Sequence, residues 1–338
     1  MTAHPDSSPR LVVKIIAGLF VAGVGYLLVS TVVFASGFLL LNLGITAGAP
    51  WIGSVQRDLY MGGLRAIWQN QPDCVSFDEE LVYRPKEGVC RFRNPGFDTT
   101  LTFAGRVRLH APMPGGRAGV AVIGDSHAMG WGVNDGETFS ARLQERIGRP
   151  VFNLGVSSYG TARELIALQR SGLLDAVDTV IIQYCDNDLV ENREFSIGSA
   201  EANRKRFEQI LQRKELTWWD RIRFMYSGLR HAQYVPFEAL LRPSRPVEML
   251  DFAPHYGPLI KRLAGMPVLA GKRVIVFYVP TREIGFRNYP AGRDRYLPHV
   301  EFVDLKIPSN VFYTLDDHMT AAGHRLVAEK LAALLARQ

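Results

Sequence analysis

From Gly119 onward, the chain alternates short apolar runs with segments of helical periodicity. Five runs have the length and composition of buried strands: Val120 to Ile123, Val151 to Leu154, Thr179 to Tyr184, Arg273 to Val279 and Glu301 to Leu305. Between the runs, apolar residues recur every three or four positions, as at Phe139, Leu143 and Ile147. This alternation predicts an α/β fold in which helices cover both faces of a parallel sheet.

The N-terminal region has no charged residue between Lys14 and Arg57, and residues 15–45 are almost continuously apolar. A bilayer-spanning helix needs about 20 apolar residues, whereas the apolar part of a cleaved signal peptide has only about 7 to 15. We therefore predict an uncleaved transmembrane anchor. Arg10 and Lys14 precede it, so the positive-inside rule places residues 1–14 in the cytoplasm. The prediction is a single-pass protein of a bacterial inner membrane, with its catalytic part on the periplasmic or extracellular side.

Three further segments follow the anchor. Residues 46–114, here called the lead-in, contain short extended stretches separated by Pro and Gly, which predict a small β-rich region. Residues 115–338 form the main domain, interrupted at about 194–271 by a mostly helical insertion. The aromatic residues of the insertion would either stack on a sugar ring or fill its own core. They are Trp218, Trp219, Phe224, Tyr226 and Tyr234.

Charge and cysteine content limit the classes of partner and the cellular compartment that the sequence predicts. The net charge is +6 over 338 residues, and no basic run is interleaved with aromatic residues, so nucleic-acid binding is not expected. Cys74 and Cys90 bracket a turn-rich segment that would lie in an oxidising compartment, which predicts a disulfide between them. Cys185 lies in an apolar run and is predicted to be a buried free thiol.

Two polar motifs carry the chemistry that the sequence predicts. Gly124-Asp125-Ser126 follows the first apolar run, and Asp316-Asp317-His318 lies near the C-terminus. A serine hydroxyl needs a base within hydrogen-bonding reach and a group that orients the base before it acts as a nucleophile. Ser126, His318 and Asp316 supply these parts, and Asp317 is the alternative acid. Taken alone, Ser126 is also a common kind of helix N-cap.

Other roles for the C-terminal polar residues are less favoured. His324, six residues after His318, is predicted to be a structural histidine on the last helix. Asp316, Asp317, His318 and His324 lack the spacing of a strong metal motif, so neither a metal site nor a cofactor is expected.

Four ordered blocks make the chain resemble the SGNH hydrolases, also called the GDSL family. The blocks are Gly124-Asp125-Ser126, Asn153-Leu154-Gly155, Asp186-Asn187-Asp188 and the segment from Asp316 to His324. The resemblance implies a flavodoxin-like sheet and an oxyanion hole formed by the Ser126 and Gly155 amides and the Asn187 side chain. Two positions depart from the family pattern. Cys185 stands where glycine is usual, and one residue separates Asp316 from His318, as in some polysaccharide O-acetyltransferases.

Three functions remain open on the sequence. The first is a membrane-anchored serine esterase that removes O-acyl groups, most simply acetyl, from a cell-envelope or exported polysaccharide or another ester. The second is an O-acyltransferase in which a sugar hydroxyl accepts the acyl group. The third is a catalytically degenerate module that binds a glycan or a partner. Gly18 and Ala22 would allow the anchor to pack closely against a membrane acyl-donor partner.

Overall fold

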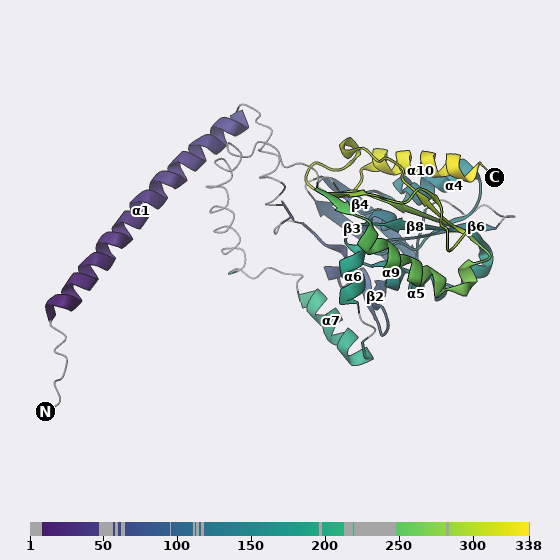
Figure 1. Cartoon of the computed structure of the whole chain (residues 1–338), viewed down its shortest axis with the longest axis horizontal. Coiled ribbons are helices and arrows are strands. Elements are labelled where there is room, and N and C mark those ends of the chain that lie inside the picture. The colour runs from purple at the N-terminus through teal and green to yellow at the C-terminus, as the bar shows by residue number, and fades with distance from the viewer. Residues whose placement is uncertain are drawn as a thin grey trace. The chain divides into compact units, whose positions relative to one another are not determined.

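The chain divides into two compact units, each described here by itself. The computed structural model describes residues 9–46, 57, 60–61, 65–94, 96–110, 112, 115, 118–195, 198–212, 219, 248–281 and 284–337. The first unit comprises Met1–Leu59 and Thr217–Arg245, and the second comprises Tyr60–Leu216 and Pro246–Gln338. The described part of the first unit is mainly helix α1 (Pro9–Thr46), drawn in purple in Figure 1.

Helix α1 is long and apolar enough to cross a membrane. Its segment Val12–Gly37 has 26 residues and a mean hydropathy of 2.3. Large apolar side chains along it are exposed, including Leu19 (68%) and Phe20 (71%). A core helix of a soluble protein would bury such side chains, whereas a lipid environment covers them. The structure therefore agrees with the predicted span, without fixing its orientation.

The second unit is built on a nine-stranded mixed sheet whose centre is parallel. The central order is β13-β10-β8-β6-β7, the 2-1-3-4-5 order of flavodoxin-like folds when these strands are counted along the chain. The five central strands are β6 (Gly119–Ile123), β7 (Val151–Asn153), β8 (Val177–Tyr184), β10 (Arg273–Tyr278) and β13 (Val300–Val303). The predicted α/β fold with a parallel sheet is thus confirmed at the centre.

Alternating side chains of β6 enter two cores on opposite faces of the sheet. Val120 and Val122 pack in a core with helices α4 (Phe139–Ile147) and α10 (Ala321–Leu335). Ala121 and Ile123 pack in the other core, with α5 (Thr161–Gln169) and α9 (Ala253–Ala264). In Figure 1, α4 and α10 lie above the sheet, and α5 and α9 lie below it. Covering both faces explains why β6 is apolar at every position.

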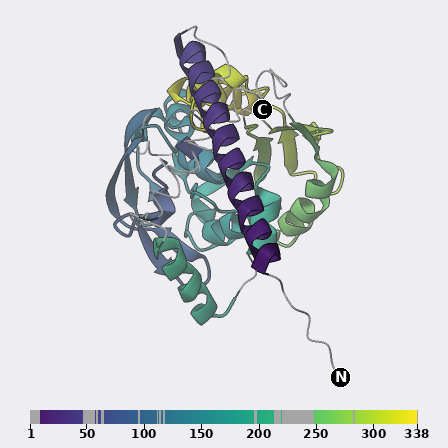
Figure 2. The same ribbon diagram turned by 90° about the vertical axis from the view of Figure 1, so that its left-hand side faces the viewer.

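The lead-in is part of the same sheet. Strands β3 (Gly88–Asn94), β4 (Phe97–Ala104) and β5 (Val107–Arg108) add to it antiparallel, through the pair Arg108 and Asn153 of β7. These blue strands lie at one edge in Figure 2, and the green C-terminal strands lie at the other. The antiparallel additions make the whole sheet mixed rather than parallel throughout.

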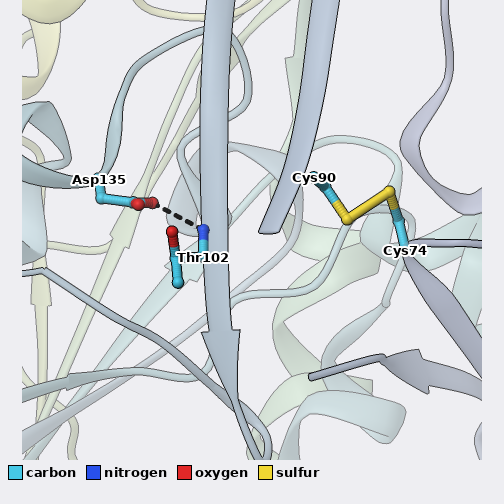
Figure 3. Close-up of a disulfide and its surroundings, with 4 residues drawn as sticks. All are labelled: Cys74, Cys90, Thr102 and Asp135. Atoms are coloured by element: carbon cyan, nitrogen blue, oxygen red, sulfur yellow. Dashed lines mark hydrogen bonds between the residues drawn. A yellow bond between two sulfur atoms is a disulfide. The ribbon is translucent and has the colours of Figure 1, made fainter. Parts of the chain in front are cut away.

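A disulfide between Cys74 and Cys90 anchors the start of the lead-in. Cys90 lies on β3 and Cys74 directly precedes β1 (Val75–Asp78), which pairs with β2 (Val82–Pro85). Figure 3 shows the bond beside β4, where the Thr102 N–H donates to Asp135 Oδ1 at 3.0 Å. The disulfide therefore joins the β1–β2 hairpin to the edge of the main sheet.

The described part of the predicted insertion contains helices and one strand. Strand β9 (Glu248–Asp251) pairs in parallel with β11 (Ile284–Arg287), and β12 (Gly292–Arg293) borders β13. Among the insertion's predicted aromatic residues, Trp219 is described and is 65% exposed; Trp218, Phe224, Tyr226 and Tyr234 lie outside the described residues. The other described helices are α3 (Ser126–Met129), α6 (Asp188–Glu194), α7 (Ala200–Gln212), η2 (Trp68–Asn70), η3 (Asp135–Glu137), η4 (Leu174–Ala176), η5 (Pro267–Leu269) and η6 (Ser309–Val311).

Candidate active site

The turn after β6 presents Ser126 at the start of α3. Gly124 has φ = +153°, and a Cβ on it would lie 2.5 Å from Gln183 Oε1, so the turn requires glycine. Asp125 caps α3, because its carboxylate accepts a hydrogen bond from the His127 N–H at 2.8 Å. The N-cap of α3 is therefore Asp125, and Ser126 is the first residue of the helix.

Gln183 on the neighbouring strand β8 braces this turn. Its buried Oε1 accepts hydrogen bonds from the Asp125 N–H at 3.1 Å and the Ala128 N–H at 3.0 Å. Sequence reasoning did not single out Gln183. The available signal was a polar residue inside the otherwise apolar stretch Thr179 to Tyr184, since a polar side chain in a buried strand needs a hydrogen-bond partner.

Ser126, His318 and Asp316 form one hydrogen-bonded series. Ser126 Oγ lies 2.6 Å from His318 Nε2, and His318 Nδ1 hydrogen-bonds Asp316 Oδ1. The His318 backbone N–H also donates to Asp316 Oδ1, at 3.2 Å. An ionised carboxylate only accepts, so Nδ1 carries the proton and Nε2 is free to accept the Ser126 proton. Of the two candidate acids, Asp316 is the one that forms this hydrogen bond with the His318 ring.

Two residues just before the first lead-in strands hold the other oxygen of Asp316. The Tyr60 hydroxyl donates to Oδ2 at 2.7 Å, and Arg65 Nε lies 3.4 Å from the same oxygen. Burial by itself raises the pKa of Asp316, but His318, Arg65 and Tyr60 together outweigh burial and hold the pKa well below its usual value. Asp316 is therefore charged at every physiological pH. No motif in the sequence marked Tyr60 or Arg65.

Gly155 and Asn187 lie beside the turn Gly124-Asp125-Ser126, here called the nucleophile turn. The resemblance places oxyanion donors there. A Cβ on Gly155 would lie 2.2 Å from Met129 N, so only glycine allows its loop to pack on α3. Its N–H donates to Asn153 Oδ1 at 3.0 Å, and Asn187 Nδ2 donates to Glu191 Oε1 at 3.2 Å. The Ser126 N–H has no acceptor among the described residues. An oxyanion would have to replace Asn153 Oδ1 and Glu191 Oε1 as the acceptors of the Gly155 and Asn187 donors. The oxyanion hole of Ser126, Gly155 and Asn187 therefore stays a prediction.

The family assignment rests on the matched length of the chain. A model of GDSL-like lipase/acylhydrolase proteins matches residues 120–331, which include Ser126, Gly155, Asn187 and His318. The chain belongs to the GDSL-like lipase/acylhydrolase family. It is therefore an enzyme of the GDSL/SGNH hydrolase type, as the motifs predicted.

Solved structures of related fold accompany this match. A protein described as lipolytic and of the G-D-S-L family, from Desulfitobacterium hafniense, is 12% identical (64% of this chain, 99% of that chain, TM-score 0.33). A family two carbohydrate esterase from Clostridium thermocellum is 14% identical (68% and 66%, TM-score 0.34), and an aryl esterase from M. smegmatis is 14% identical (65% and 99%, TM-score 0.30). No match was found among curated proteins. At these TM-scores the likeness adds nothing to the family assignment.

Buried acids surround this GDSL-type nucleophile turn. Burial is the largest influence on each, and it raises the pKa of Asp125 to about 6, of Asp188 to about 7 and of Glu191 to about 8. The pKa of buried Glu164 is raised well above its usual value, and neither of its carboxyl oxygens has a hydrogen-bond partner among the described residues. The fold therefore holds protons on several carboxyl groups near neutral pH.

Three other chemically capable residues have positions that limit their roles. Cys185 is buried, and burial followed by the charges of nearby aspartates raises the pKa of its thiol well above the usual value, so it is no thiolate nucleophile. His324 Nδ1 accepts a hydrogen bond from the Phe139 N–H at 3.1 Å, and burial lowers its pKa to about 3, so His324 is structural, as expected. His127 is buried and neutral, with its ring centroid 4.7 Å from that of His318.

Proposed function

We propose that the protein is a membrane-anchored serine esterase that removes O-acyl groups, most simply acetyl, from a cell-envelope or exported polysaccharide. The observation that carries the proposal is the continuous hydrogen-bonded series from Ser126 through His318 to Asp316. Membership of the GDSL-like family supports ester hydrolysis. The intact series also argues against the third prediction, a catalytically degenerate module.

The proposed reaction follows from the orientation of the His318 ring. Ser126 Oγ attacks the ester carbonyl while its proton passes to His318 Nε2. The bond to the sugar oxygen then breaks, and His318 returns the proton to that oxygen. Water next attacks the acyl-serine with His318 as base, releasing the carboxylic acid and restoring Ser126. Asp316 stays ionised throughout and stabilises the imidazolium form. An O-acyltransferase would follow the same path with a sugar hydroxyl in place of water.

The test uses the full chain in detergent. We expect labelling by a fluorophosphonate and hydrolysis of para-nitrophenyl acetate, with both lost in Ser126→Ala and turnover lost in His318→Ala. Ser309→Ala is the matched control, because Ser309 is exposed on η6 outside the hydrogen-bonded series. Product analysis with an acyl donor plus an oligosaccharide separates the two enzymes: an acylated sugar indicates a transferase. Wild-type protein that is folded yet neither labelled nor active contradicts the proposal.

The proposed location is the inner membrane, with the second unit on the periplasmic side. The basic residues Arg10 and Lys14 ahead of the apolar segment favour a cytoplasmic N-terminus. The disulfide of Cys74 and Cys90 supports an oxidising compartment for the lead-in. Protease added to intact spheroplasts should therefore digest the second unit. Protection of the second unit until the membrane is lysed would reverse this orientation.

A further inference from the structure

A polar cavity of about 490 Å³ lies within the second unit, beside the predicted oxyanion donors. Its walls come from η2 and β2 of the lead-in, the loop after β7, and helices α5, α6 and α7. Small-molecule sites in proteins occupy about 300–1,000 Å³, so this space accommodates one or two sugar rings. Its polar lining residues include Gln69, Ser158, Arg163, Glu191, Glu194 and Arg206.

Two connections place this cavity next to the reacting serine. Glu191 lines the cavity and accepts a hydrogen bond from Asn187 Nδ2 at 3.2 Å. Asn187 in turn hydrogen-bonds Asp125, the residue before Ser126, which lowers the pKa of Asp125 against the larger effect of burial. On the other wall, Ser158 lies on the same short loop as Gly155, which packs on α3. The cavity wall is therefore linked to the residues that flank Ser126, through Glu191 on one side and Ser158 on the other.

The cavity wall carries hydrogen-bonding groups that the described residues leave unused. Glu191 Oε2 and Arg163 Nε are both buried and have no hydrogen-bond partner among the described residues. The nearest approach of the two side chains, from Arg163 Nη2 to Glu191 Oε2, is 4.0 Å, which is too long for a hydrogen bond. Leaving a buried polar group without a hydrogen-bond partner is destabilising. A ligand hydroxyl that hydrogen-bonds the Glu191 carboxyl group and the Arg163 guanidinium group would supply both missing partners.

The lining favours a hydroxyl-rich ligand. Burial raises the pKa of Glu191 to about 8, so near neutral pH its carboxyl group keeps a proton and can both donate and accept hydrogen bonds. A hydroxyl group donates one hydrogen bond and accepts two, which suits a carboxyl group beside a guanidinium group. An aliphatic chain would leave these groups unpaired, whereas a sugar ring offers several hydroxyls at fixed spacing.

We propose that this cavity is a sugar-binding subsite that holds a sugar unit of the substrate next to the unit that carries the acyl group, with Glu191 and Arg163 as the paired hydrogen-bonding groups. This inference rests on the proposed esterase function and names the substrate class of the same site. Gln209, on α7, also lines the cavity, and no contact links it to Ser126, His318 or Asp316 in the described part of the chain. It is thus a position from which the cavity can be filled without altering the reacting groups.

The test fills the cavity with Gln209→Trp in the full chain in detergent. Glu208→Trp is the matched control, because Glu208 is exposed on the same helix and does not line the cavity. The substrates are para-nitrophenyl acetate, which has no sugar, and O-acetylated cellotetraose. We expect Gln209→Trp to raise KM for acetylated cellotetraose by roughly tenfold or more, with kcat/KM for para-nitrophenyl acetate within about twofold. Glu208→Trp should leave both substrates unchanged.

A second measurement separates the subsite from the esterase activity. Ser126→Ala protein is titrated with unmodified cellotetraose by calorimetry, and the binding should disappear in the Ser126→Ala, Gln209→Trp double variant. Binding of this kind in a protein without esterase activity upholds the subsite and rejects the proposed function. Hydrolysis of para-nitrophenyl acetate with neither binding nor turnover of the cellotetraose substrates rejects the subsite alone. Equal effects of Gln209→Trp on both substrates, or no effect on either, also reject the subsite.

Discussion

The lead-in and the main domain supply the same site in different ways. The main domain contributes Ser126, Gly155 and Asn187 from loops at the carboxyl ends of adjacent parallel strands, where such loops converge. In the lead-in residues that the structure describes, the strands of the main sheet are antiparallel and contribute no loop of this kind. Its Tyr60 and Arg65 contact Asp316, and Tyr60 is 256 residues away in sequence. The main domain therefore places the reacting groups, and the lead-in fixes their orientation from outside.

Arg108 shows how firmly the lead-in holds the nucleophile turn. Its guanidinium is fully buried and donates to the carbonyls of Met129, Gly130 and Val133 and to Asp135 Oδ1, at 2.6–2.9 Å. These carbonyls belong to the C-terminal end of α3 and the loop that follows. A short helix gains little stability by itself, so the position of Ser126 depends on a residue from another part of the chain.

The largest expected effect lies in the main domain. Asp316→Asn should lower kcat/KM for para-nitrophenyl acetate by roughly 10⁴-fold, because an amide no longer fixes the His318 tautomer or stabilises the imidazolium. Asp317→Asn is the matched control and should keep most of the activity, because it is Asp316 that contacts the ring. Steady-state kinetics on both variants checks this, and equal losses would show that Asp317 shares the orienting role.

The second largest effect is expected from Arg108, whose buried guanidinium group belongs to the lead-in. Arg108→Met should destabilise the second unit by about 3–5 kcal/mol, because Asp135 and three carbonyls lose a buried partner. Chemical unfolding of the full chain in detergent measures this loss. Arg91→Met is the control and should have a much smaller effect, because Arg91 pairs with Asp98 on the surface. A similar stability for both variants would mean that the lead-in does not support the turn.

A smaller effect is expected from the hydrogen bond between Tyr60 of the lead-in and Asp316, the proposed catalytic acid. Tyr60→Phe should lower kcat by roughly tenfold to a hundredfold, since hydrogen bonds to charged groups contribute about 1.5–3 kcal/mol. The melting temperature should change little, because the ring stays packed. Exposed Tyr296→Phe is the control. A fall in kcat that only matches a fall in the folded fraction would make Tyr60 a purely structural residue.

The smallest expected effect concerns the pH dependence of stability. Burial raises the pKa of Glu164, so the folded chain keeps a proton that the unfolded chain releases at lower pH. The stability that this group contributes is present below the usual pKa of glutamic acid and is lost as pH rises toward its folded value, by at most about 1.4 kcal/mol per pH unit. Glu164→Gln should therefore flatten the pH dependence of stability above the usual pKa of glutamic acid. Unfolding at several pH values checks this, with exposed Glu208→Gln as control, and an unchanged slope would contradict it.

Much of the fold could be predicted from local patterns of apolar residues in the sequence. The five central strands lie within a few residues of the predicted runs, because a strand buried on both faces must be apolar at nearly every position. The lead-in was predicted to be β-rich but not to extend the main sheet. That extension depends on the pairing of Arg108 with Asn153, a long-range contact that leaves no local periodicity in the sequence.

The sequence by itself determined which groups are candidates for the chemistry, because a strand followed by Gly-Asp-Ser and a late Asp-x-His offer a possible nucleophile, base and acid in any fold that brings them together. Only the tertiary structure decided that Asp316 hydrogen-bonds the His318 ring, and that Tyr60, Arg65, Arg108 and Gln183 contact the candidate site. The physical reason is that a hydrogen bond depends on distance and direction to within a few tenths of an ångström. Such placement is set by the packing of distant segments and not by spacing along the chain.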